Sequence, residues 1–164
     1  MSIKKKDSNR NVNPEIGSEV DQKYLQSFYP KPEKDMKWVF SMGINIQGIN
    51  VHAELIMEIT EINGNNVKIK TTLGTQSFES TTSLDTFAPV PSGSGANKNS
   101  SGYIYESTED LTVPFNEFKG IAKLSTPTNE GRAHLWLAPG IGPVKFGIIS
   151  AGIPATLELK EFIH

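Results

Sequence analysis

The chain has 164 residues, a formal net charge of -2 and no cysteine. This length suits one domain with a core large enough to fold unaided. The near-neutral charge predicts no general affinity for nucleic acid. The absence of cysteine excludes disulfides, thiol catalysis and thiolate metal sites. No apolar run approaches the roughly 18 residues that cross a bilayer as a helix.

Residues 1–20 form a polar segment with a local excess of positive charge, from Lys4 to Lys6 and Arg10 against Asp7. Its Asn-, Ser- and Lys-rich composition predicts a disordered tail rather than an arm that binds anionic lipid. The lysines are not followed by the apolar segment of a secretory signal. We therefore expect the protein either in the cytoplasm or, if a signal was removed, outside it. In the second case it is periplasmic or lipid-anchored, with the tail as a tether.

One short helix is expected at residues 21–28, where Tyr24, Leu25 and Phe28 share one side. Pro30 and Pro32 end it, because proline cannot continue a helix.

From residue 37 the apolar period becomes two, which is typical of strands. Strands at 37–46 and 51–60 are separated by Gln47-Gly48, and Asn63-Gly64 predicts a hairpin into a strand at 67–73. The strand at 76–84 is polar, with Phe78 as its only large apolar residue before Leu84. It suits the edge of a sheet.

Residues 85–102 are rich in Pro, Gly and Ser and form the longest break, either disordered or a cover over a ligand. Further strands are expected at 103–107, 111–113, 118–125, 132–137, 144–148 and 156–162. Roughly nine or ten strands at near-regular spacing predict an all-β, mainly antiparallel fold. We expect a curved meander sheet that forms a half-barrel or a sandwich, in a single domain over residues 21–164. No helix is long enough for the crossover of a parallel sheet.

Polar residues predict neither catalysis nor metal binding. His52, His134 and His164 are far apart and lack the spacing of metal ligands. Glu54 and Glu58 suit a solvated strand face better than a general acid and base. The Gly-x-Gly segments at 93–95 and 140–142 are not completed as phosphate loops, and no nucleophile elbow occurs. We therefore expect no enzyme, no cofactor and no metal.

The remaining signal is apolar. Large side chains gather on one strand face, which is either a packed core or a concave surface that admits a lipid or other apolar molecule. Two methionines on this face fit a tolerant pocket. Trp136 falls on the opposite face, where it is either exposed to a partner or covered by something that the sequence does not identify. The predicted ligand-binding residues are Trp38, Phe40, Met42, Met57, Phe78, Leu135, Leu137 and Phe146.

Three segments together resemble a broad set of bacterial extracytoplasmic and lipoprotein-like proteins. They are Tyr29-Pro30 with Lys37-Trp38-Val39-Phe40, then residues 111–119 (LTVPFNEFK), and residues 135–145 (LWLAPGIGPVK) with Leu157-Glu158-Leu159. The third is similar to W-x-A-P-G-V-G-x-V-K and is the most specific. The chain departs from the pattern at Phe115-Asn116, where Ala-Gly is usual, and at Asp35-Met36, where a glycine precedes the aromatic strand.

This resemblance implies a curved antiparallel sheet akin to the lipoprotein-carrier half-barrels, an envelope location and no known enzymatic activity. We therefore predict a non-enzymatic extracytoplasmic protein that holds a lipid or other apolar ligand on the concave sheet face. The alternative is a structural or interaction module that docks on an envelope protein through a sheet edge, with strand 76–84 as the contact. Neither nucleic acid binding nor a transmembrane segment is expected.

Overall fold

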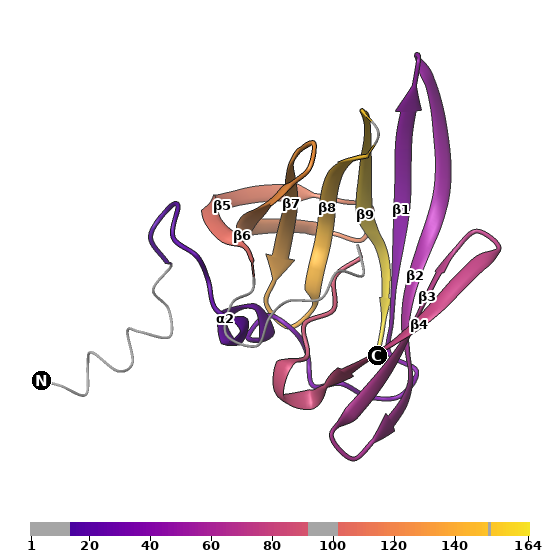
Figure 1. Cartoon of the computed structure of the whole chain (residues 1–164), viewed down its shortest axis with the longest axis vertical. Helices are drawn as coiled ribbons and strands as arrows, with labels where there is room; N and C mark the ends of the chain where they lie inside the picture. The colour runs from indigo at the N-terminus through magenta and orange to yellow at the C-terminus, as the bar shows by residue number, and fades with distance from the viewer. Residues whose placement is uncertain (1–13, 92–101, 151) are drawn as a thin grey trace, which may run out of the picture.

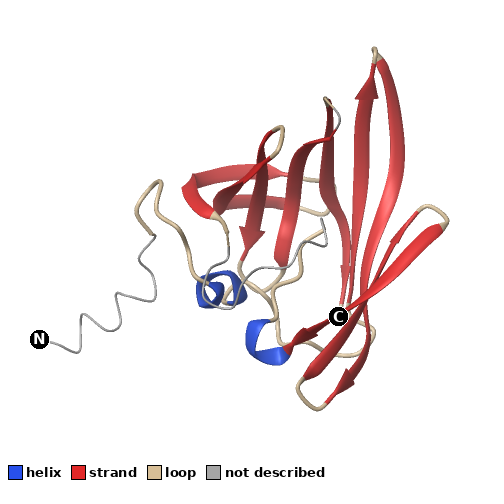
Figure 2. Cartoon of the chain, in the orientation of Figure 1, coloured by secondary structure: helices blue, strands red, loops and turns tan. Residues whose placement is uncertain are grey.

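A computed structural model describes residues 14–91, 102–150 and 152–164 (Figure 1). Nearly all of its regular structure is strand, as Figure 2 shows. The strands form one antiparallel sheet in the order β4-β3-β2-β1-β9-β8-β7-β6-β5. The predicted all-β, antiparallel class with one short helix is confirmed. Of the two predicted forms, the described strands form a single open sheet rather than the two sheets of a sandwich.

The elements have the following bounds. The strands are β1 Lys37–Ile46, β2 Ile49–Asn63, β3 Asn66–Leu73, β4 Gln76–Ser83, β5 Ile104–Thr112, β6 Glu117–Thr128, β7 Gly131–Ala138, β8 Gly142–Ser150 and β9 Ile153–Ile163. The helix α2 spans Gln22–Gln26, and the 3-10 turn η1 spans Leu84–Thr86.

Two meanders meet in the middle of the sheet. Strands β1 to β4 run outward in one direction, and β5 to β9 run back from the far edge until β9 lies beside β1. The two strands pair from Lys37 opposite Ile163 to Ile44 opposite Ala155. The first and last strands are therefore central, and both edges of the sheet come from the middle of the chain.

Most strands begin and end close to the predicted bounds. The Gln47-Gly48 turn has positive φ angles of 51° and 85°, which suits a tight hairpin. The region expected as separate strands at 103–107 and 111–113 is instead one strand, β5. Its pairing with β6 shifts register at Tyr105/Ser107 and at Glu109/Leu111. Such β-bulges interrupt the side-chain alternation by which a strand is predicted from its sequence.

Two segments outside the sheet cover part of its inner face. The helix α2 is capped by Asp21, whose carboxylate accepts a hydrogen bond from the Tyr24 amide at 2.8 Å. Gln22 and Gln26 donate from their side-chain amides to carbonyls of η1, at Thr86 and Leu84. Helix and turn are thereby held together, and they lie below the lower ends of β7 and β8 in the view of Figures 1 and 2.

The segment before α2 also belongs to the fold. Glu19 forms a bridge with Ile104 at the start of β5, and the Gly17 amide donates to the Tyr105 carbonyl at 2.7 Å. Val20 is buried in the core. Two predicted segments lie partly outside the described residues. They are the tail, at residues 1–13, and the long break, at residues 92–101, which includes the glycines of 93–95.

Tyr29, Trp38 and the turn between β7 and β8 meet in one close contact. Trp38 donates its indole N–H to the Ile141 carbonyl at 2.8 Å. Gly142 has a φ of +96°, and a Cβ added there would lie 2.8 Å from the Tyr29 ring. A glycine is thus required at 142 both by its backbone and by the ring that packs on it. Tyr29 in turn donates its hydroxyl to the Pro89 carbonyl at 2.6 Å.

We expect Gly142→Ala to destabilise the protein by roughly 2–4 kcal/mol, because it combines a left-handed backbone with a clash against the Tyr29 ring. Gly140→Ala is the matched control: its φ is +79° but nothing lies within 4 Å of the added Cβ. It should cost only about 1–2 kcal/mol. Urea unfolding measures both, and equal losses in the two variants would contradict the contact described here.

Burial raises the pKa of Tyr29 well above its ordinary value, and nearby Tyr103 raises it further. The unfolded chain therefore loses this proton first as the pH rises, and the free energy of unfolding falls above about pH 10. At pH 7, Tyr29→Phe should lower the free energy of unfolding by roughly 1 kcal/mol, because the hydrogen bond to Pro89 is lost. Between pH 9 and 11, the free energy of unfolding of this variant should fall less steeply than that of the unaltered protein. Unfolding curves at several pH values test this, and parallel declines in the two proteins would refute it.

Candidate functional site on the inner sheet face

Six of the eight predicted ligand-binding residues are buried in the protein's own core. Trp38, Phe40, Met57, Leu135, Leu137 and Phe146 are at most 2% exposed. Met42 is partly buried and packs against the same cluster. Phe78 is 52% exposed on the edge strand β4. The structure therefore places the predicted set on one face and brings seven of its members together.

The covering segments supply aromatic rings against this cluster. The ring centroids of Tyr29 and Phe87 are 5.8 Å apart, and Trp38 lies 6.5 Å from Tyr29 and 6.4 Å from Phe87. Phe162 from β9 lies 5.4 Å from Trp38 on the sheet itself. This half of the inner face is thus packed by the residues that precede β1 and follow β4.

The inner face continues beyond that cover as an apolar surface. On the β1–β2 hairpin the facing pairs are Ile44 with Val51 and Ile46 with Ile49. The row of Ile44 continues through Ala155 on β9 to Ile148 on β8. We name this surface the aliphatic strip: Ile44, Ile46, Ile49, Val51, Ala53, Ile148, Ile153 and Ala155.

Exposure is greatest where the strip follows the hairpin. Ile49 is 67% exposed, and Ile46 and Val51 are each 42% exposed. The β1–β2 hairpin projects from the end of the sheet opposite α2, as Figure 1 shows. Leu73 on β3 and Phe78 on β4, both exposed, extend the apolar surface toward the sheet edge.

The opposite side of the same hairpin is polar. Asn45 donates from its side-chain amide to the Asn50 side chain at 2.9 Å, and its oxygen accepts from the Gly48 amide at 3.1 Å. His52 is exposed on that side as well. The hairpin is therefore amphipathic, with the apolar side turned toward the inner face.

The predicted ligand-binding residues include no member of the aliphatic strip, for a specific reason. Alternation placed Ile44, Ile46 and Val51 on the same strand face as Trp38 and Phe40, and the register confirms this. Nothing in the alternation shows how far the covering segments reach. The prediction favours the largest side chains, and six of those eight are buried in the protein's own core.

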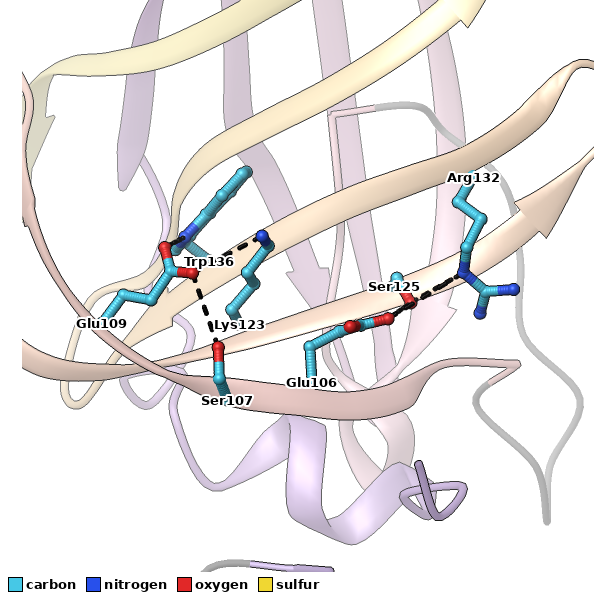
Figure 3. A network of polar contacts seen from close by, with 7 residues as sticks. All are labelled: Glu106, Ser107, Glu109, Lys123, Ser125, Arg132 and Trp136. Carbon is cyan, nitrogen blue, oxygen red and sulfur yellow. Dashed lines mark hydrogen bonds and ion pairs between the residues drawn. The ribbon is translucent and has the colours of Figure 1, made fainter. Parts of the chain in front are cut away.

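A polar network on the outer face accounts for Trp136 (Figure 3). Its indole N–H donates to Glu109 at 3.1 Å, and the ammonium groups of Lys123 and Lys145 lie 5.3 Å and 5.1 Å from its ring centroid. These are cation–π distances. Trp136 is therefore partly covered by neighbouring side chains of its own sheet.

A second cluster in Figure 3 joins Ser125, Glu106 and Arg132. Ser125 is completely buried, donates its hydroxyl to Glu106 and accepts from the Arg132 Nε at 3.0 Å. Its cross-strand partner is His134, whose pKa is lowered by burial and by Lys123. A nucleophile must be reachable by substrate, so the complete burial of Ser125 favours a structural role.

Comparisons with known proteins give one structural likeness. The sequence matches no protein-family model and no curated protein. The fold is similar to the crystal structure of a Bacteroides fragilis protein, provisionally described as exported and as having a YmcC-like fold. The TM-score is 0.49 at 11% identity, over 84% of this chain and 99% of the other.

Within the part of the chain that the structure describes, no helix combines the length and hydropathy needed to span a membrane.

The outer-face network makes a prediction for Glu109. The pKa of this carboxylate is lowered chiefly by the hydrogen bond from Trp136, while Lys123 and Ser107 contribute less. We expect Trp136→Phe to raise the pKa of Glu109 toward its ordinary value, and Ser107→Ala to raise it less. NMR titration of the side-chain carboxyl measures both shifts, and a larger shift in Ser107→Ala would contradict this order.

Proposed function

We propose that this domain is a non-enzymatic, extracytoplasmic binding protein that holds a lipid or other apolar molecule against the aliphatic strip. The observation that carries the proposal is the exposure of Ile46, Ile49 and Val51 side by side, at the end of the inner face that the described segments leave open.

The energetics support an apolar occupant. Contiguous exposed apolar patches are uncommon on soluble monomers and mark sites of contact. Covering a large aliphatic side chain fully contributes about 1.5–3 kcal/mol, so partial cover of several neighbours supplies a useful binding free energy. The strip has no charged member, so an acyl chain meets no desolvated charge there.

The backbone that carries the strip is rigid. Its strands β2, β1, β9 and β8 are hydrogen-bonded neighbours in the sheet, and the Asn45 side chain forms hydrogen bonds on the outer side of the β1–β2 hairpin. Because the strip is preorganised, little conformational entropy is lost when a ligand binds.

The non-enzymatic and extracytoplasmic parts of the proposal have separate support. In the polar cluster around Ser125, the hydroxyl that could act as a nucleophile is buried and already bonded to Glu106 and Arg132. The envelope setting rests on the resemblance of residues 111–119 and 135–145 to extracytoplasmic proteins.

Titration with a fluorescent fatty acid tests the site. We expect the double variant Ile46→Ser with Val51→Ser to bind roughly tenfold or more weakly, because two apolar contacts are lost. The matched control is Ile149→Ser with Ile163→Ser. These two isoleucines are 38% and 42% exposed but lie on the outer face by register, so binding should be unchanged.

Thermal unfolding of both double variants confirms that each remains folded. The proposal would be contradicted if both double variants lost affinity for the fatty acid to the same extent. It would also be contradicted if the unaltered protein bound no fatty acid and an organic extract of it contained no lipid.

A further inference from the structure

The two edges of the sheet are protected very differently. β5 carries two bulges and is covered by residues 17–20, whose backbone pairs with Tyr103 and Tyr105. β4 pairs with β3 over its whole length without a register shift, and its first six residues are exposed. Proteins normally blunt an exposed edge with bulges, prolines, lysines or a covering segment. β4 has none of these within the described residues, and its single charge is Glu79.

The backbone groups that β4 leaves free follow from its turn. Leu73 and Gln76 pair across the two residues Gly74 and Thr75, and the closing pair of such a hairpin is hydrogen-bonded. Alternate residues therefore direct their backbone toward β3. The remaining residues, 77, 79, 81 and 83, direct their N–H and C=O groups away from the sheet.

We propose that this edge pairs with the same edge of a second copy, antiparallel and centred on Ser80, so that the two sheets join. The proposal does not depend on the aliphatic strip or on any ligand there.

The register follows from geometry and charge. A ladder forms only when outward-directed residues face one another, which they do when Ser77 lies opposite Ser83 and Glu79 opposite Thr81. Centring the pair on Glu79 would place two like charges face to face, which destabilises a strand pair. Centring it on Thr81 would shorten the ladder, because η1 begins at Leu84.

Charge complementarity favours a second copy as the partner. Thr81 faces Lys68 within its own sheet, where Lys68 also lies 3.5 Å from Glu61, and Glu79 faces Lys70. A contact across the two-fold axis therefore extends the ion pair that each copy already has. In the proposed pair, Glu79 of one copy lies two strand spacings, about 10 Å between backbones, from Lys68 of the other. Two long side chains can bridge that distance, and the two-fold axis repeats the contact. Phe78, on the inner face, lies opposite Thr82 of the second copy, so pairing shields part of its exposed ring.

Sedimentation velocity over a concentration series tests the pairing with the full chain. The unaltered protein should form a dimer. Thr81→Pro removes one outward N–H without touching the β3 ladder, and it should raise the dimer dissociation constant roughly tenfold or more. Thr81→Val keeps the N–H and is the matched control, so its dimer should persist. Circular dichroism confirms that both variants fold.

A charge variant tests the register. Thr81→Glu places a carboxylate beside Lys68 of its own sheet but opposite Glu79 of the second copy, so it should weaken the dimer. The unfolding temperature of the monomer, measured at a concentration below the dimer dissociation constant, should stay unchanged or rise. Amide hydrogen exchange should show slower exchange at Glu79 and Thr81 in the dimer. A monomer at every concentration, or a dimer that Thr81→Pro and Thr81→Glu leave intact, overturns the proposal.

Discussion

The contact of Tyr29 and Trp38 with the Ile141–Gly142 turn holds the covering segments on the sheet. The Trp38 indole fixes a carbonyl of the turn, and the Tyr29 ring occupies the space that a side chain at 142 would need. Through its hydroxyl Tyr29 reaches Pro89, beyond η1. One aromatic residue thus links the segment before β1, the turn between β7 and β8 and the segment after β4.

Much of the fold could be predicted because two-residue periodicity and turn residues are local properties. The polar composition of 76–84 identified an edge strand, and β4 is one. Asp35 has a φ of 73°, a backbone conformation that glycine suits, and it lies where the resemblance described above predicts a glycine. The continuity of β5 could not be predicted, because two bulges interrupt its alternation. The pairing of β1 with β9 is a property of the whole chain and leaves no local signal.

The candidate site was harder to predict than the strands that form it. Size and aromaticity identify residues that are buried somewhere, and Trp38, Phe40 and Leu135 are among the most buried in the structure. Whether such residues face a ligand or the protein itself depends on segments that are distant in sequence, here α2 and the residues after η1. Ile46, Ile49 and Val51 could not be singled out from the sequence, because aliphatic residues are common in strands. Their distinguishing property is their exposure in the folded protein.

The central pairing of β1 with β9 also constrains the order of folding. The first meander can form as soon as β4 has been made, but β1 then presents an unpaired, apolar inner edge until the last strand arrives. Contacts between such distant segments form slowly, since a long loop must close first. Until then the incomplete sheet is open to wrong pairings with other chains. Pairing of β9 with β1 is therefore the step that joins the two meanders, and without β9 neither β1 nor β8 would have its partner in the middle of the sheet.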